Sequence, residues 1–355
     1  MQKKQSKSRK IEKKSNSWGD NDPRVQSAIQ SNEYNQENLK AFEASSEENL
    51  YDDKQLTTAI EDSKNKHKDW NANDAFYSGH LSSWEPDESI DYIEDFKKLG
   101  NIHQQKEASF SCIGYAVSDL VHWHLEQKGI HVSRLSARFN WIAAKEIDEN
   151  NTRPTTFIEQ AGSTLKAGLD VARNYGSVPD DFFPTDKEET FKGTAQHFYA
   201  HASKYRIANY FSLIVEKELV VGGRRINKTE HQKLQTLLWK KWINEKGPIL
   251  VRVNVDRTFY HAKGRSPLVD YGQNEAYQKH AALLIGYNQQ GFILRNSWGT
   301  DWGNKGYATL GYSYAQEALD EAYGITLPND EVGRPLHAPV QEKTFYQRLL
   351  DFFKN

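Results

Sequence analysis

Cysteine is nearly absent from this chain: Cys112 is the only one among 355 residues. An intrachain disulfide is therefore impossible, and so is a zinc site built from several thiolates. Apolar runs are also short, and none approaches the roughly 18 residues that a membrane-spanning helix needs. The basic opening, MQKKQSKSRKIEKK, is not followed by the apolar core of a secretory signal. We therefore expect a soluble, cytoplasmic protein without a membrane span.

A strong charge of either sign is missing as well. The formal net charge is −2, so bulk electrostatics give no reason to expect a nucleic-acid partner. The lysine-rich terminus agrees with an ordinary solvated tail. Any partner must therefore be recognised by a local site.

The amino-acid composition of the chain changes near residue 85. Residues 1–84 are polar and predict a disordered or regulatory extension, for which removal of an inhibitory segment is one hypothesis. Residues 85–327 have the pattern of a globular domain. Residues 328–355 form a C-terminal extension, and the spacing of Phe345, Leu349, Phe352 and Phe353 predicts an amphipathic helix. That helix either docks on the protein itself or contacts a partner.

Within the globular part, helical patterns precede strand patterns. Apolar residues recur at helical spacing from Cys112 to Gly129, and LSARFNWIAAKEID and STLKAGLDVARNYG predict two more helices. After a charged, helix-leaning stretch over 187–246, the runs GPILVRVNV, KHAALLIGYN, GFILRNSWG and GYATLGY predict strands. This order indicates an α+β fold, with a helical part packed against an antiparallel sheet or barrel.

Three residues of this domain suggest nucleophilic chemistry. Cys112 stands where a helix begins, so unpaired N–H groups and the helix dipole favour its thiolate and predict a low pKa. His280 and Asn296 flank a hairpin predicted at NQQG, which brings their side chains together. Asn296 would then orient the imidazole toward Cys112, and Trp298 would shield this hydrogen bond from water.

The segments SFSCIGYA, KHAALLIGY and LRNSWGTDWGNKGY resemble the Cys, His and Asn motifs of the papain-like (C1) cysteine peptidases, in the same order. The resemblance extends over residues 89–326. The helical part is similar to that of bacterial and archaeal members of the family. The resemblance implies a two-lobed fold with an active-site cleft between a helical domain and a β-rich domain. Cys112 and His280 would lie on opposite walls, and a polypeptide substrate would lie extended between them.

The resemblance also implies an activity and further site residues. Peptide hydrolysis would proceed through a Cys112–His280–Asn296 triad and a thioester acyl-enzyme, without a metal or organic cofactor. Gly162 occupies the place where the family's backbone pairs with substrate. Gln105 is the candidate for the oxyanion hole, although it lies one residue further from Cys112 than the motif predicts, where Lys106 stands instead.

Other interpretations remain open at this point. An inactive papain-like scaffold would explain the displaced Gln105, and an acyl-transferase or ligase would use the same acyl-enzyme. A transglutaminase-like or amidase fold shares Cys and His but normally has a different third residue. His122 and His124 are two residues apart, which places them on different helix faces and favours structural roles over metal binding.

Overall fold

The computed structural model of this chain describes the following residues: 75–76, 86–105, 110–148, 162–186, 200–215, 220–221, 224–225, 227–276 and 278–328. The predicted C-terminal helix lies outside them. Residues 1–84 also lie outside them, except for Ala75 and Phe76, which form strand β1. The domain limits at 85 and 327 therefore stay predictions.

Three helices form the N-terminal half of the described domain, after the short strand β2 (Ile90–Asp91) and helix α3 (Ile93–Leu99). They are α4 (Cys112–Gln127), α5 (Ala137–Ile147) and α6 (Leu165–Asn174). Ser136 and Thr164 cap α5 and α6 by accepting backbone N–H bonds with their side chains. Gly129 ends the α4 region with a φ of 70°, as expected for a glycine that follows a helix. All three helices agree with the sequence pattern.

The C-terminal half is dominated by one sheet. Its strands are β3 (Asn209–Ser212), β6 (Ile249–Val255), β7 (Gln278–Asn288), β8 (Gly291–Arg295), β9 (Tyr307–Gly311) and β10 (Leu319–Thr326), with β1 and β2 added. The order is β1-β3-β10-β6-β7-β8-β9, and β2 pairs with β7. Among the described strands, β1 and β9 are the edges, so the sheet does not close into a barrel.

Several smaller elements complete the described chain. They are η2 (Ser203–Tyr205), β4 (Val220–Val221), β5 (Arg224–Arg225), α8 (Lys228–Glu245), α9 (Arg257–Tyr260), η3 (Gln273–Glu275) and α10 (Tyr312–Ala318). The expectation for 187–246 was therefore incomplete, because β3 lies within this stretch. The apolar run from Ile207 to Val215 is its sequence signal, and charged neighbours obscured it.

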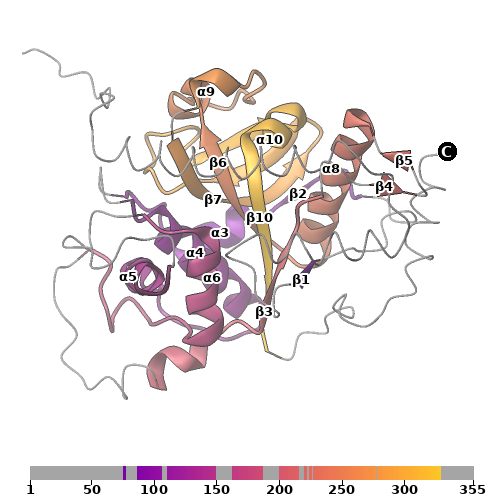
Figure 1. Ribbon diagram of the computed structural model, residues 1–355. Helices are drawn as coiled ribbons and strands as arrows, with labels where there is room; N and C mark the ends of the chain where they lie inside the picture. The colour runs from indigo at the N-terminus through magenta and orange to yellow at the C-terminus, as the bar shows by residue number, and fades with distance from the viewer. Residues whose placement is uncertain are drawn as a thin grey trace, which may run out of the picture.

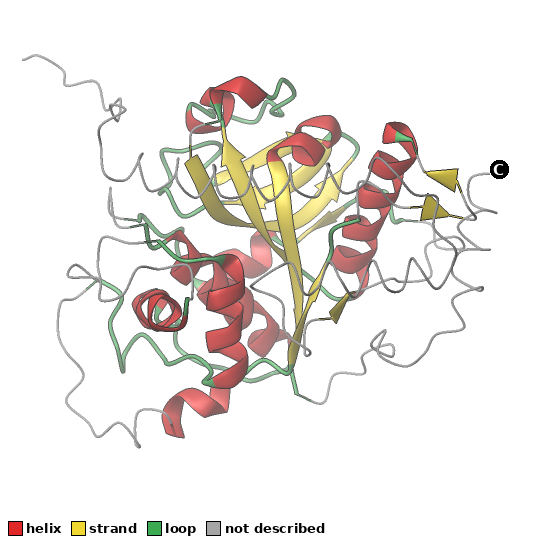
Figure 2. Cartoon of the chain, in the orientation of Figure 1, coloured by secondary structure: helices red, strands yellow, loops and turns green. Residues whose placement is uncertain are grey.

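The two faces of the sheet are covered by different helices (Figure 1). Helix α4 packs on one face against Leu250, Ala281 and Leu283. Helices α8 and α10 cover the other face, where Trp239 and Tyr314 are almost fully buried. In Figure 2 the helices α4, α5 and α6 gather on one side of the strands. The architecture is therefore α+β, as the sequence predicts.

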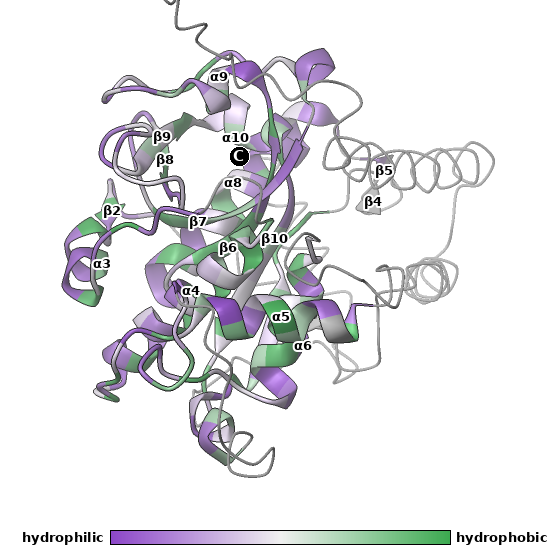
Figure 3. Ribbon diagram, turned by 90° about the vertical axis from the view of Figure 1, so that its left-hand side faces the viewer, coloured by the Kyte–Doolittle hydropathy of each residue, from purple (hydrophilic) through white to green (hydrophobic). Residues whose placement is uncertain are grey.

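Helices α5 and α6 carry both hydrophilic and hydrophobic residues, as Figure 3 shows. Their apolar side chains, including Phe139 and Val171, meet in a smaller core beside α4. The amphipathic pattern of the sequence thus directs these helices onto α4 and not into solvent.

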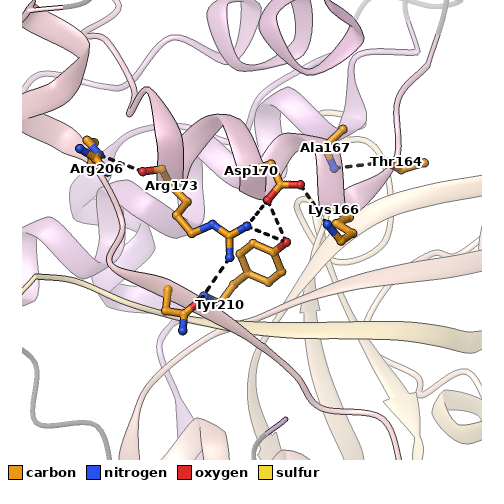
Figure 4. Close-up of polar contacts among 8 residues, drawn as sticks. Thr164, Lys166, Ala167, Asp170, Arg173, Arg206 and Tyr210 are labelled. Carbon is orange, nitrogen blue, oxygen red and sulfur yellow. Dashed lines mark hydrogen bonds and ion pairs between the residues drawn. The ribbon is translucent and has the colours of Figure 1, made fainter. Parts of the chain in front are cut away.

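A polar cluster ties α6 to strand β3 (Figure 4). Asp170 accepts hydrogen bonds from Lys166 Nζ at 3.1 Å, Arg173 Nη2 at 2.6 Å and the Tyr210 hydroxyl at 2.9 Å. Lys166 and Arg173 are both buried, so the carboxylate compensates two desolvated cations. The cluster fixes the helical half on the sheet at the end of α6.

A close backbone approach joins α4 to α5 at Gly114. A Cβ built on Gly114 would lie 2.2 Å from the Ala137 carbonyl oxygen, which is too close for any side chain. A second helical glycine, Gly168, would instead place its Cβ 2.7 Å from the Cγ1 atom of the Ile113 side chain. Of these two contacts, only the one at Gly114 is between two backbone segments.

We expect Gly114→Ala to destabilise the protein, although alanine normally favours a helix interior by about 0.5–1 kcal/mol over glycine. The clash should reverse that sign and cost about 1–3 kcal/mol, the usual range for overpacking. Urea unfolding measures this, and Gly168→Ala is the matched control with a smaller expected cost. A Gly114→Ala protein as stable as the parent would contradict the close approach.

Candidate active site

The candidate nucleophile lies at the contact between the helical half and the sheet. Cys112 is the first residue of α4 and is partly buried. The backbone of Ala281, in β7, hydrogen-bonds its thiol, and so do the backbones of Ile113 and Cys112. Because Ala281 directly follows His280, the structure brings the first two predicted residues together.

Two unusual features precede the nucleophile. Phe110 has a φ of 50°, in the left-handed region that bulky residues rarely adopt. A Cβ built on Gly162 would lie 3.7 Å from the Phe110 Cβ, so Gly162 lies beside the segment that leads into Cys112. The position of Gly162 is thus established, whereas its contact with substrate stays a prediction.

His280 and Asn296 lie side by side, as the hairpin predicted. Strands β7 and β8 pair antiparallel through a turn at residues 289 and 290, with Asn288 opposite Gly291. The His280 Nε2 and Asn296 Oδ1 atoms are 2.6 Å apart, and both residues are buried. The expected proximity of this pair is confirmed.

The neighbouring backbone determines which ring nitrogen carries the proton. The Ser297 N–H donates to Asn296 Oδ1 at 2.7 Å, so this atom must be the amide oxygen. An oxygen acceptor at 2.6 Å requires that His280 Nε2 carries hydrogen. In a neutral imidazole, Nδ1 is then the lone-pair nitrogen and is available as a base.

Aromatic rings surround this hydrogen bond. The Trp298 ring lies 4.6 Å from that of His280, and Phe259 lies 5.5 Å from Trp298. Trp302 completes the group, since its indole N–H donates to the Phe259 carbonyl at 2.9 Å. The predicted position of Trp298 beside the pair is confirmed. The part of Phe259 was not predicted, because the short helix α9 has no clear periodicity.

Gln105 lies beside the same loop. Its N–H donates to the Ser297 carbonyl at 2.7 Å, and the Ser297 hydroxyl donates to Gln105 Oε1 at 3.2 Å. Gln104 bridges to Trp298, so this segment pairs with the loop that follows β8. Residues 106–109 lie outside the described part of the chain. The role of Gln105 in an oxyanion hole stays a prediction.

The charge state of the pair differs from the sequence-based expectation. Burial raises the pKa of the Cys112 thiol, and the backbone hydrogen bonds lower it only in part. Burial also lowers the pKa of His280 to about 4, against the raising effect of Asn296. The predicted low thiol pKa is therefore wrong for the unliganded arrangement, because removal from water penalises each charged form more than the helix N-terminus stabilises it.

His122 and His124 have separate surroundings on α4. The His122 Nε2 atom lies 3.2 Å from the Val132 carbonyl oxygen, whereas the His124 ring lies edge-on to Trp123. Their different directions agree with the spacing of two residues. Within the described residues, no group of three His, Cys, Asp or Glu side chains is arranged to hold a metal ion. None of the described helices is long and apolar enough to cross a membrane.

A buried ion pair connects the two halves of the site. Arg295 Nε and Nη2 donate to Asp119 Oδ2 at 2.9 and 2.8 Å, and Arg295 Nη1 donates to the Tyr307 hydroxyl at 3.0 Å. His103 Nε2 lies 3.4 Å from Asp119 Oδ1. Burial raises the pKa of Asp119, but the charge of Arg295 and then the contact with His103 outweigh it, so the pKa lies well below its ordinary value.

Comparison with known proteins relates part of the chain to one family of proteases. Residues 185–324, which include His280 and Asn296, match the model of papain family cysteine proteases. This part of the chain is therefore similar to papain family cysteine proteases. The match does not include Cys112. The position of Cys112 at the start of α4 comes from the structure alone.

Curated relatives match over short segments. A cysteine protease of Blomia tropicalis is 38% identical over 69 residues, which cover 18% of this chain and 21% of the relative. Cathepsin K of Gallus gallus is 35% identical over 81 residues, covering 22% and 24%. The chain thus spans about a fifth to a quarter of the length of these relatives.

Solved structures match over a longer part. Xylellain, a cysteine protease from Xylella fastidiosa, gives a TM-score of 0.55 at 19% identity and covers 72% of this chain and 92% of that one. Procathepsin L 3 of Tenebrio molitor gives 0.52 at 16% identity, with coverage of 70% and 73%. The fold is therefore papain-like across both the helical half and the sheet.

The burial of His280 predicts a pH dependence of stability. The folded pKa of about 4 lies below the ordinary value of about 6.5, so the unfolded chain binds more protons in this interval. The free energy of unfolding should fall by up to about 3 kcal/mol as the pH drops from 6.5 to 4. His280→Gln should remove this part of the slope in urea unfolding, whereas the exposed His261→Gln control should retain it. Equal slopes in all three proteins would contradict a buried neutral His280.

The Asp119–Arg295 pair predicts a non-additive effect on stability. Asp119→Leu alone leaves the buried guanidinium without its carboxylate and should cost about 3–5 kcal/mol. The double variant Asp119→Leu with Arg295→Met removes both charges and should recover most of that loss. Thermal or urea unfolding of the parent, Asp119→Leu, Arg295→Met and the double variant measures the coupling, and simple additivity would show that the pair is not energetically linked.

Proposed function

We propose that this chain is a cysteine-type endopeptidase that hydrolyses peptide bonds with Cys112, His280 and Asn296. The observation that carries the proposal is the joint arrangement of two contacts. The Ala281 backbone hydrogen-bonds the thiol, which places Cys112 against the residue that follows His280, and Asn296 holds the imidazole in the tautomer with an unprotonated Nδ1. A nucleophile, a base and an orienting group are the minimum that acyl transfer requires.

The reaction begins from an uncharged pair. As Cys112 Sγ attacks the scissile carbonyl carbon, the thiol proton passes to His280 Nδ1, and the carbonyl oxygen becomes an oxyanion. The Cys112 N–H and Gln105 are the candidate donors to that oxygen. His280 then protonates the leaving amine as the C–N bond breaks, which leaves a thioester on Cys112.

Water resolves the thioester in the second half. His280 accepts a proton as water attacks, and the C–S bond breaks to release the carboxylic acid and return the thiol. Asn296 stabilises the imidazolium that forms in each half, because its Oδ1 accepts the Nε2 proton. The surrounding rings of Trp298 and Phe259 keep competing water from this hydrogen bond.

Turnover of an unbiased fluorogenic peptide library tests the proposal. We expect cleavage by the parent chain and a loss of about 10³-fold or more for Cys112→Ser and His280→Ala, the scale seen when a nucleophile or base is removed. Asn296→Ala should lose less, because it disturbs orientation only. The same variants are scored for iodoacetamide labelling at pH 7.5 by intact mass, which is unambiguous with a single cysteine.

The outcomes separate the alternatives. Cleavage that yields amide products only when an amine is added would indicate a transferase or ligase. A folded parent that cleaves no member of the library and labels Cys112 at the same rate with or without His280 would contradict the peptidase proposal and favour an inactive scaffold.

A further inference from the structure

A short segment before α4 pairs with the loop that follows β8. The Gly299 N–H donates to the His103 carbonyl at 2.9 Å. The Gln105 N–H donates to the Ser297 carbonyl at 2.7 Å, and the residues between these two bonds form an antiparallel bridge. The two segments therefore run side by side as strands do, and Asn296 directly precedes the second one.

This pairing places the side chains of His103 and Gln105 on one face of their segment. Side chains two residues apart in an extended segment point the same way. The His103 ring lies 4.5 Å from the ring of Tyr115, which is three residues after Cys112 on α4. The alternation therefore turns the Gln105 side chain toward the helix that begins with the candidate nucleophile.

His103 is a buried polar residue with one long contact. The residue is 7% exposed, and its Nε2 atom lies 3.4 Å from Asp119 Oδ1. This nitrogen makes no hydrogen bond of regular geometry to the described residues, so its contact with the carboxylate is mainly electrostatic. A buried polar atom without a strong partner is uncommon in proteins and calls for an explanation.

The Asp119 carboxylate joins three parts of the candidate site. Asp119 lies on α4, about two helical turns after Cys112. Its Oδ2 atom accepts two bonds from Arg295, which directly precedes Asn296, and its Oδ1 atom faces His103. The helix with the nucleophile, the strand that leads to the orienting amide and the segment before α4 therefore meet at one carboxylate.

A serine hydroxyl determines which end of the Gln105 carboxamide can donate. Ser297 Oγ donates to Gln105 Oε1 at 3.2 Å. This bond occupies the acceptor end of the carboxamide, which leaves the NH2 end as its donor. Such a donor stabilises an oxyanion when it lies about 2.7–3.1 Å from the atom on which the charge develops. The contribution of Gln105 therefore depends closely on where its backbone is held.

We propose that His103 is a positioning residue for the oxyanion hole, because it fixes the segment of Gln105 to α4 through Tyr115 and Asp119. The inference rests on the proposed peptidase function and adds a residue outside the triad. His103 acts through Gln105: its carbonyl pairs with the loop after β8, while its ring packs on the helix of the nucleophile. A displacement of about 1 Å in a catalytic group lowers the rate by about a hundredfold.

Two reactions of the same thiol test this role. Peptide cleavage passes through an oxyanion, whereas alkylation by iodoacetamide does not, since the S–C bond forms as the C–I bond breaks and the thiol proton is lost. In the full chain, kcat and KM for a fluorogenic peptide amide are compared with the alkylation rate of Cys112 by intact mass. His103→Leu should lower kcat about ten- to a hundredfold and leave KM and the alkylation rate within about twofold of the parent.

A double-mutant cycle tests whether His103 acts through Gln105. Gln105→Ala alone should lower kcat about a hundredfold, the scale for loss of one oxyanion donor. His103→Leu should add little in the Gln105→Ala background, because the group that it positions is already missing. His103→Gln, whose side-chain N–H takes the place of the Nε2 donor, should recover most of the kcat that His103→Leu loses.

His122→Gln is the matched control. His122 is another buried histidine that contacts α4's own surroundings, with its Nε2 atom 3.2 Å from the Val132 carbonyl oxygen. Both of its rates should match those of the parent. Circular dichroism and urea unfolding establish that each variant is folded. If His103→Leu does not fold, His103→Asn replaces it with the same expected loss, because its shorter amide stays polar but does not reach Asp119.

The results distinguish this inference from the function on which it rests. Equal losses of cleavage and alkylation in a folded His103 variant, or a loss that adds fully to that of Gln105→Ala, would overturn the positioning role and leave the peptidase proposal intact. So would full activity of either single variant. Absence of cleavage by the folded parent would overturn the peptidase proposal, and this inference with it.

Discussion

The buried ion pair between Asp119 and Arg295 is the contact on which the geometry of the candidate site depends. Asp119 is seven residues after Cys112 on α4, which is about two helical turns, and Arg295 directly precedes Asn296 at the end of β8. The candidate nucleophile Cys112 and the candidate orienting residue Asn296 are more than 180 residues apart in the sequence. A planar guanidinium held by two nitrogens on one carboxylate fixes both distance and orientation, which a flexible lysine would not do.

Burial opposes ionisation of the Cys112 and His280 side chains. The packing that brings Cys112 against β7 also removes its thiol and His280 from water, so the unliganded pair favours its neutral state. In the proposed mechanism, charge develops only during attack, when the proton moves from sulfur to Nδ1. An amide oxygen already placed on Nε2 and backbone N–H groups already directed at sulfur reduce the reorganisation that this step needs.

Much of this arrangement could be predicted from the sequence, because local signals determine it. The helix starting at Cys112, the hairpin between His280 and Asn296, and the indole of Trp298 each follow from periodicity, turn chemistry or a short motif. The thiol pKa could not be predicted, because it depends on how closely α4 lies against β7, and no local pattern encodes that distance. Strand β3 was missed for a related reason, since its apolar run is short and its partner β10 lies more than 100 residues away.

The sheet has irregular strand pairing at two positions near the candidate site. The candidate triad residues lie at the N-terminus of α4, on β7 and directly after β8, and the pairing of β7 with β8 shifts register between Leu284 and Gly286. A charged group, in which Arg252 of β6 pairs with Asp320 and Glu321 of β10, depends instead on one extra residue in β10. Removal of that residue would return one carboxylate to the opposite face without moving Ala281 or His280. The extra residue in β10 thus determines which charged groups share the face that carries α4, while the candidate triad residues stay where α4, β7 and β8 place them.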